Sequence, residues 1–372
     1  MEPPRAHAPP PIADALIRVP RHAFIPAAAW VEPAAGDGYW IDRDRDPDRW
    51  WRAVCADTVI YTQLDDGGTE LTPRNAARAF APTCSASSPL LIAAFLRRLA
   101  PAPGDRILEV GTGTGWTAAL LADLTGDPGR VTTVEIDPAL AATAAAALRA
   151  AGPPPRLVVG DGTRGVPEHG PYDRLHITAG VREIPYAWIE QTRPGGVIVL
   201  PYAPVMRLLR LVVAGDGTAL GTFHEDCAFM PLRSQRPPAA APPAAPAPSP
   251  DRVRPLERDP APLLDPPPGL QLLLDVLIGD LPWEDRTGAL VLDAAGSRAT
   301  VREGRVAQRG PRDLWDEAER VHAAWTDRGA PGPDRMGLRL TRESQYVWLD
   351  DPSFAVADIL TTRGTRGETE HG

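Results

Sequence analysis

Three glycines alternate with other residues in the stretch EVGTGTGW, which runs from Glu109 to Trp116. Gly111, Gly113 and Gly115 lack the side chains that would obstruct a tight turn or the close approach of a ligand. A short apolar run precedes this loop and a predicted helix follows it, so the first N–H groups of that helix can bind a polar ligand. The spacing differs from the GxGxxG of dinucleotide sites, because the third glycine comes one residue early.

Carboxylates follow the next two predicted strands along the chain. Glu135 ends the run VTTVE, where its carboxylate can accept hydrogen bonds from both hydroxyls of a ribose, and Asp137 is the alternative acceptor. Asp161 lies in the GDG after the third predicted strand, where it can accept from an adenine amino group while Gly162 allows a close approach. Together these groups are suited to a nucleoside ligand.

An acidic residue that opens a GxGxG loop, with further acids at the ends of the next strands, resembles the pattern of S-adenosylmethionine-dependent methyltransferases. The resemblance implies that S-adenosyl-L-methionine is the cofactor and that Glu109 faces its amino-acid end. The predicted cofactor-binding residues are Glu109, Gly111, Thr112, Gly113, Gly115, Glu135, Asp137, Asp161 and Gly162.

The elements that must position these residues alternate between short apolar runs and helical segments from Leu90 to Leu200. The runs RILEVG, VTTVEID, RLVVGDG, YDRLHITAG and GGVIVLPY read as buried strands. Most segments between them have the apolar spacing of helices. We therefore expect an α/β fold with a doubly wound, Rossmann-like sheet of the class I methyltransferase type, whose ligand lies at the carboxyl ends of the strands.

Composition excludes several other classes of protein. Asp and Glu number 48 against 39 Lys and Arg, a net charge of −9, whereas nucleic-acid binding needs a concentrated basic surface. No apolar run approaches the roughly 20 residues that span a bilayer, and the N-terminus lacks a signal pattern. Cys55, Cys84 and Cys227 are widely separated and form no CxxC pair, so we expect no metal site and no disulfides. We expect a soluble, cytoplasmic protein that binds neither nucleic acid nor membranes.

A proline-rich stretch divides the chain. Many of its 44 prolines fall in residues 234–269, where they favour extended backbone and a semi-rigid linker. We predict an N-terminal segment over residues 1–82 that packs on the catalytic domain, a methyltransferase domain over 83–233, and the linker. A small α+β module follows over 270–372, and we expect it to help recognise the substrate.

Seven stretches between Arg18 and Leu232 resemble, in the same order, motifs of the protein-L-isoaspartate O-methyltransferases. LEVGTGTGWTAALLA is very similar to that family's cofactor motif, and GDGTRG and PYDRLHITAG are similar to its next two. The other four are VPRHAFIP, TCSASSP, IPYAWIEQTRPGGVIVLP and FMPLR. The resemblance covers nearly two-thirds of the chain and implies transfer of a methyl group to a peptide carboxylate.

The stretch TCSASSP resembles the family's Thr-x-Ser-x-Pro substrate loop in two registers. The family's Ser-x-Pro fits residues 87–89, whereas its Thr-x-Ser fits residues 83–85. The resemblance implies that these hydroxyls orient the substrate carboxylate, which needs no general base because it is ionised near neutral pH. The substrate should arrive where a central strand ends at residues 178–180. The predicted catalytic residues are Ser87, Ser88, Ser85 and Thr83, and the predicted substrate-binding residues are Thr178, Ala179 and Gly180.

A long insertion and the C-terminal module distinguish this chain from ordinary repair enzymes of the family. The layout resembles the homologues that accompany ribosomally synthesised, modified peptides such as lanthipeptides and graspetides. That resemblance implies methylation of an aspartyl side chain in a precursor peptide, after which the ester closes to an aspartimide or continues to isoaspartate. The alternatives are a repair methyltransferase for damaged proteins, a small-molecule methyltransferase, and a non-catalytic protein that binds cofactor or peptide.

Several histidines and tryptophans are expected to have structural roles. A histidine in a buried strand more often packs than reacts, and a histidine beside two acids does not make a metal site. Tryptophans in the insertion are expected to pack rather than to form a peptide-binding platform. The residues concerned are His22, His176, His224, Trp40, Trp50 and Trp51.

Overall fold

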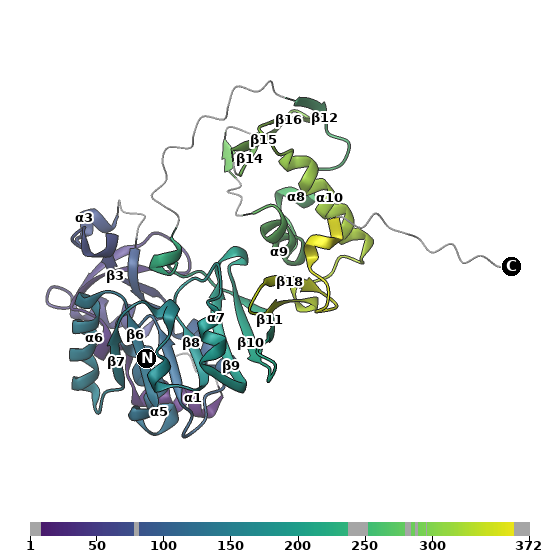
Figure 1. The fold of residues 1–372 in the computed structure, drawn as a ribbon. Helices are drawn as coiled ribbons and strands as arrows, with labels where there is room; N and C mark the ends of the chain where they lie inside the picture. The colour runs from purple at the N-terminus through teal and green to yellow at the C-terminus, as the bar shows by residue number, and fades with distance from the viewer. Residues whose placement is uncertain are drawn as a thin grey trace. The chain divides into compact units, whose positions relative to one another are not determined.

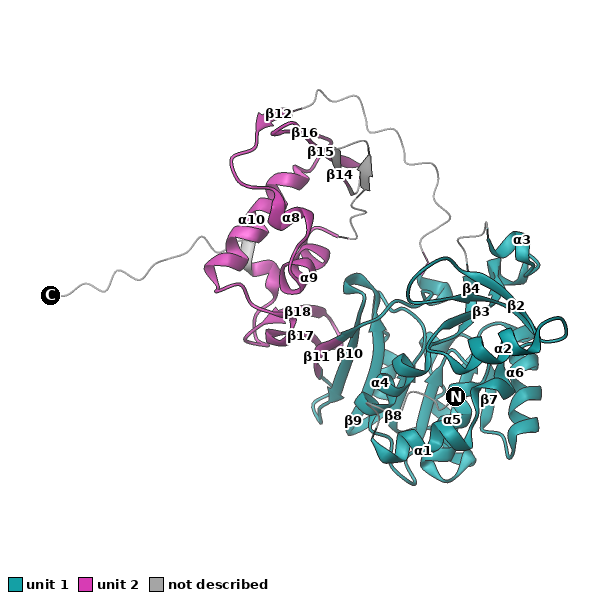
Figure 2. Cartoon of the chain, turned by 180° about the vertical axis from the view of Figure 1, so that it is seen from behind, with its two compact units in different colours: residues 1–219, 225–235 teal, residues 220–224, 236–372 magenta. Residues whose placement is uncertain are grey.

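A computed structural model describes residues 9–77, 82–236, 252–279, 284–286, 289–294 and 296–360. The chain divides into two compact units (Figures 1 and 2). Unit 1 comprises residues 1–219 and 225–235, and unit 2 comprises residues 220–224 and 236–372. All the predicted site residues belong to unit 1, so unit 1 is described in more detail.

Six strands of unit 1 form a sheet in the order β10-β9-β8-β5-β6-β7. The pairs from β9 through β7 are parallel, and β10 is antiparallel to β9. The chain runs from β5 outward through β6 and β7 and then returns to the other side of β5 with β8, so the strand order reverses there. Ligands of doubly wound sheets bind at such a reversal. The strands are β5 (Ile107–Val110), β6 (Val131–Glu135), β7 (Arg156–Val159), β8 (Tyr172–Ile177), β9 (Thr192–Tyr202) and β10 (Arg207–Val213).

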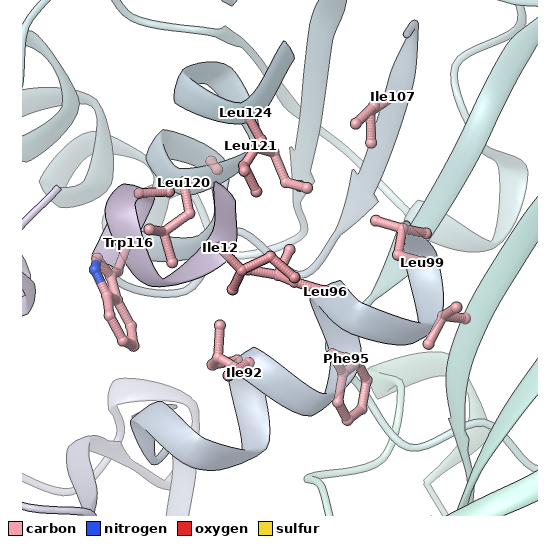
Figure 3. Packing of buried hydrophobic residues seen from close by; sticks show 14 of the residues in the cluster. Ile12, Ile92, Phe95, Leu96, Leu99, Ile107, Trp116, Leu120, Leu121 and Leu124 are labelled. Atoms are coloured by element: carbon pink, nitrogen blue, oxygen red, sulfur yellow. The ribbon is translucent and has the colours of Figure 1, made fainter. Parts of the chain in front are cut away.

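Helices α1 (Pro10–Arg18), α4 (Pro89–Leu99) and α5 (Trp116–Thr125) bury their apolar faces in one hydrophobic core. Figure 3 shows Ile12, Ile92 and Leu120 from these three helices in this core, which also includes Ile107 of β5. All four residues of β5 are buried, as a central parallel strand requires. Helices α6 (Pro138–Ala151) and α7 (Tyr186–Glu190) complete the connections between strands.

Local sequence explains where α4 begins. Pro89 occupies the first turn, where its missing N–H costs nothing, and the Ser88 side chain accepts a hydrogen bond from the Leu91 N–H at 3.4 Å. The helix ends at Leu99, because Ala100 adopts a left-handed conformation. This cap places residues 83–88, here called the serine-rich stretch, immediately before α4.

A second, antiparallel sheet, here called the N-terminal sheet, has the order β2-β1-β3-β4 and extends to residue 86, past the predicted end of the N-terminal segment at residue 82. Helix α2 (Pro47–Cys55) covers one face of it, where Trp50 is buried with Val31, Ile41 and Ile60. The strands are β1 (Ala28–Glu32), β2 (Tyr39–Asp42), β3 (Val59–Leu64) and β4 (Pro82–Ala86), and a short helix, α3 (Pro73–Ala76), lies between β3 and β4. The last strand, β4, runs directly into the serine-rich stretch.

The described residues of unit 2 form an antiparallel sheet in the order β12-β16-β15-β14-β13, three helices and a hairpin. The hairpin β17–β18 lies beside residues 220–224 of β11 (Ala219–Asp226). The other elements are β12 (Arg252–Pro255), α8 (Ala261–Leu264), α9 (Pro268–Leu277), β13 (Glu284–Arg286), β14 (Ala289–Ala294), β15 (Ser297–Arg302), β16 (Arg305–Arg309), α10 (Leu314–Asp327), β17 (Met336–Leu340) and β18 (Gln345–Leu349). The sheet is antiparallel and the helices lie between groups of strands along the chain, which is the composition of an α+β module.

The structure differs from the sequence prediction in the second half of the proposed linker. Residues 237–251 lie outside the described residues, but residues 252–255 form β12, which pairs with β16. Pro255 is tolerated because β12 is an edge strand, where an absent N–H breaks no ladder. Helix α8 and the start of α9 also fall within residues 234–269. Among the helices described, none is long and apolar enough to cross a membrane.

Candidate active site

The glycine-rich loop joins the end of β5 to the start of α5. Gly111, Gly113 and Gly115 have φ angles of 96°, 53° and 91°, a left-handed region that side chains disfavour. A Cβ at Gly111 would also stand 2.6 Å from the Thr178 hydroxyl oxygen. The positive φ and the close approach together explain why glycine is needed at position 111.

Glu109 lies beneath this loop and is completely buried. Its Oε2 accepts a hydrogen bond from the Thr133 hydroxyl at 2.6 Å, and the hydroxyls of Thr133 and Thr112 are also 2.6 Å apart. Thr133 has one proton, which it donates to Glu109, so Thr112 is the donor in the second bond. Glu109 therefore supports the loop through Thr133. Its Oε1 has no hydrogen-bond partner in the described chain and lies 3.7 Å from Nδ1 of His176.

Glu135 at the end of β6 also holds the loop. Its carboxylate accepts hydrogen bonds from the Gly113 N–H at 2.9 Å and from the Asp137 N–H at 3.1 Å. Burial raises the pKa of Glu135, and these two N–H donors oppose the increase. A carboxylate in this position can accept further hydrogen bonds from the hydroxyls of a nucleoside.

Asp137 has a different set of partners. One carboxylate oxygen caps α6 by accepting from the Ala139 and Leu140 N–H groups, and the other accepts from Gln63 and Arg233 at 3.2 Å each. Burial alone would raise the pKa of Asp137, but these hydrogen bonds hold it below its usual range. Asp137 is therefore occupied as a cap and an ion-pair partner.

Thr83 belongs to the network around Asp137 rather than to the loop. Its hydroxyl donates to Gln63 at 2.8 Å and accepts from the Asp66 N–H at 3.0 Å. Arg233 links Asp66 to Asp137, with an Nη2 distance of 2.9 Å to the Asp66 carboxylate. The network thus joins the N-terminal sheet to the start of α6.

Asp161 follows β7 and accepts a hydrogen bond from the Thr163 N–H at 3.0 Å. The next residue, Gly162, approaches Val110 so closely that a Cβ would stand 2.3 Å from its Cγ1. We expected the small size of Gly162 to allow a ligand to approach, whereas in the structure it makes room for Val110 at the end of β5. Asp161 remains next to β6, because the Gly160 N–H donates to the Glu135 carbonyl.

The serine-rich stretch lies against the glycine-rich loop. A Cβ at Gly113 would lie 3.6 Å from the Cys84 sulfur and 3.8 Å from the Ser85 carbonyl oxygen. The Ser85 hydroxyl lies 3.9 Å from the Met230 sulfur. Ser88 caps α4, whereas the Ser87 hydroxyl makes no hydrogen bond to the residues that the structure describes. Burial raises the pKa of the Cys84 thiol to about 12, so Cys84 is neutral near physiological pH.

The end of β8 contacts both the loop and the segment that carries Met230. The Thr178 hydroxyl lies 3.0 Å from the Val110 carbonyl and donates to the Gly111 carbonyl at 2.6 Å. The Gly180 N–H donates to the Met230 carbonyl at 2.8 Å, and Ala179 lies between these two contacts. Thr178 therefore fixes the loop, and Met230 connects the end of β8 to Ser85.

Arg21 is the most important residue that the sequence reasoning missed. Its guanidinium is buried and donates to the carbonyls of Val54, Thr58, Ala86 and Ser87 at 2.7–3.3 Å, with a longer contact to the Ala56 carbonyl at 3.5 Å. It also lies 5.6 Å from the ring centroid of Trp116, the first residue of α5. Burial lowers the pKa of Arg21 to about 10, which leaves it charged at neutral pH. Arg21 therefore fixes the backbone that presents Ser87.

The histidines named from sequence have structural surroundings. His22 packs on Trp51 with ring centroids 4.7 Å apart, and His176 is fully buried against Phe95 at 5.6 Å. In the described ranges no three His, Cys, Asp or Glu side chains gather in a way that could hold a metal ion. Cys55, Cys84 and Cys227 are free thiols.

The polar groups around the glycine-rich loop fit S-adenosyl-L-methionine. Glu135 and Asp161 follow neighbouring strands and offer acceptors for ribose hydroxyls and an amine, while the glycine-rich loop presents backbone at the reversal of strand order. Glu109 fits less directly than expected, because its side chain is buried beneath the loop. The residues that would hold the cofactor are the loop residues, Glu135 and Asp161.

Comparison with known proteins identifies the family. The family model described as Protein-L-isoaspartate(D-aspartate) O-methyltransferase (PCMT) matches residues 74–237. The chain is 32% identical over 225 residues to the protein-L-isoaspartate O-methyltransferase of Methanopyrus kandleri, an alignment that covers 59% of this chain and 82% of that protein. It is 38% identical over 150 residues to the Pyrococcus horikoshii enzyme of the same name, covering 39% and 67%.

A solved structure titled protein-L-isoaspartate O-methyltransferase shares the fold, with a TM-score of 0.52 at 21% identity. That alignment covers 92% of this chain and 96% of the solved chain. The expected doubly wound α/β fold of the class I methyltransferases is therefore confirmed. The family match confirms S-adenosyl-L-methionine as the cofactor. The chain belongs to the protein-L-isoaspartate O-methyltransferase family and is a methyltransferase.

Proposed function

We propose that this methyltransferase acts on an aspartyl side chain of a dedicated precursor peptide, and that the resulting ester closes to an aspartimide. The observation that carries the proposal is the contact between the glycine-rich loop and the serine-rich stretch at Ser85. The serine-rich stretch continues β4, so a peptide bound along the N-terminal sheet would reach the cofactor loop. This sheet contains the insertion that lengthens the N-terminal segment.

The chemistry asks the protein for alignment more than for proton transfer. When bound, S-adenosyl-L-methionine supplies an electrophilic methyl group. The substrate carboxylate is ionised near neutral pH, so no base has to remove a proton before an oxygen of the carboxylate forms the new bond. Ser87 and Ser85 orient that carboxylate by hydrogen bonding, which also favours its charged form. Holding the reacting atoms in position can supply much of the rate enhancement.

The second step belongs to the modified peptide. The backbone nitrogen of the next residue attacks the ester carbonyl, forms the carbon–nitrogen bond of the five-membered imide and loses its proton, while the methoxy group leaves as methanol. Overall the peptide loses one molecule of water. Hydrolysis of the imide then gives aspartate or isoaspartate, so either the imide or isoaspartate can be the final product.

Repair of damaged proteins is the second candidate, because the family relatives carry the name of that activity. Chain length does not separate the two functions. The alignment to a solved protein-L-isoaspartate O-methyltransferase covers 92% of this chain, so C-terminal length alone is no argument against repair. The two functions differ in substrate, since repair acts on isoaspartate in many sequences, whereas maturation acts on aspartate in one peptide.

We further propose that the reaction takes place in the cytoplasm, in keeping with three free thiols.

We also propose that unit 2 recognises the peptide. This role predicts slower hydrogen exchange in α10 and the β15–β16 hairpin when a peptide substrate is added to the full chain. Mass spectrometry of exchanged fragments measures this. Protection confined to unit 1 would show that unit 2 does not take part in recognition.

A further inference from the structure

A cavity of about 360 Å³ lies beside the N-terminal sheet, on the face away from α2. Trp30, Glu32 and Tyr61 line it, together with Leu64, Pro82 and the alanines at the end of α3. Sites for small ligands and side chains are usually apolar hollows with a few polar groups. This cavity has that character, and neither the family motifs nor the cofactor contacts account for it.

The strand register connects the residues of the cavity with the serine-rich stretch. Trp30 of β1 pairs with Tyr61 of β3, and Tyr61 pairs with Ser85 of β4. Directly paired residues project from the same face of a sheet, so these side chains form a row that begins at Trp40 of β2, the partner of Trp30. The row ends at Ser85, which contacts the cofactor loop.

The charge of the cavity is unbalanced. Glu32 accepts a hydrogen bond of 3.4 Å from the Trp30 indole, and in the described part of the chain no arginine pairs with its carboxylate. Among the residues that the structure describes, no cationic side chain lines the cavity. Burial, and then the charge of Glu32, raises the pKa of Tyr61, in keeping with a carboxylate close to the phenol. Aromatic faces beside a carboxylate attract cations.

We propose that this cavity binds an arginine or lysine side chain of the substrate peptide. The proposal rests on the proposed function in one respect, namely that the substrate is a peptide. Neighbouring strands lie about 4.8 Å apart, so Trp30 and Ser85 are separated by roughly 10 Å, and an extended peptide advances about 3.3 Å per residue. The basic residue therefore lies about three residues from the modified aspartate.

The test compares pairs of short synthetic peptides with the full chain and S-adenosyl-L-methionine. Each pair carries a central aspartate or isoaspartate in a neutral sequence, with either arginine or its uncharged analogue citrulline two to four residues away. For the wild-type chain, arginine at the best position is expected to lower KM about tenfold relative to citrulline. Equal KM values at every position would overturn the proposal.

Two variants locate the effect. Glu32→Gln and Trp30→Leu are expected to reduce the arginine-to-citrulline ratio to about one, whereas the exposed control Glu70→Gln keeps it. A preference that survives Glu32→Gln would also overturn the proposal. Fluorescence anisotropy of the same labelled peptides measures binding without methyl transfer. If no peptide is methylated, the proposed function fails, and the binding preference still decides the role of the cavity.

Discussion

Replacement of Arg21 by methionine is expected to destabilise the chain by about 3–5 kcal/mol and to reduce methylation more than the loss of folded protein explains. The guanidinium donates to carbonyls in α2, just before β3 and at the end of β4. Methionine fills similar space but leaves several buried carbonyls without a donor, each at a cost of about 1–3 kcal/mol. Urea unfolding measures the stability, and initial rates below the transition measure the activity.

Arg18→Met is the matched control for this prediction. Arg18 pairs with Asp123 at 2.7 Å, but its side chain is 54% exposed. Exposed ion pairs contribute little to stability because water screens them, so this variant should unfold nearly as the wild type does. If Arg21→Met is no more destabilising than Arg18→Met, Arg21 does not organise the site.

Replacement of Ser87 by alanine is expected to lower kcat about 10²-fold. The Ser87 backbone is fixed by Arg21, while its hydroxyl is not occupied by a residue in the described ranges and can bind the substrate carboxylate. Loss of a positioning hydrogen bond at the reacting group costs about this much. Ser85→Ala is expected to cost only about tenfold, since the Ser85 hydroxyl already contacts the Met230 sulfur. Initial rates at saturating cofactor and peptide measure both effects.

Ser88→Ala separates folding from catalysis in this stretch. It removes the cap of α4 and should cost about 1 kcal/mol of stability, read from thermal unfolding.

A larger fall in kcat for Ser85→Ala than for Ser87→Ala would assign the substrate loop to the register of residues 83–85. Rates within twofold of the wild type for both serine variants would contradict any role for these hydroxyls.

Much of unit 1 could be predicted from sequence because its signals are local. The alternation of apolar runs and helical segments predicted β5 to β9, and the predicted glycine-rich loop joins β5 to α5. Side-chain capping, as at Ser88, acts within one turn and is visible in sequence.

The remaining features depend on contacts between distant residues. Gln63 and Arg233 reach Asp137 from 74 and 96 positions away, and no local pattern predicts that meeting. Trp50 and Trp51 are neighbours in sequence, yet Trp50 is 1% exposed and Trp51 is 43% exposed, because α2 presents one to the sheet and the other to solvent. The packing role expected for Trp50 fits its burial. A different tryptophan, Trp30, lines the cavity beside the N-terminal sheet.

The proposed reaction is methylation of an aspartyl side chain of a dedicated peptide, followed by closure of the ester to an imide. The most direct measurement is mass spectrometry of the purified full chain with S-adenosyl-L-methionine and short precursor peptides encoded beside its gene, run in parallel with generic isoaspartyl peptides. We predict that one precursor gains a methyl group and then loses methanol, a net loss of one water. Methylation of the isoaspartyl peptides with every precursor unchanged would contradict the claim and support protein repair.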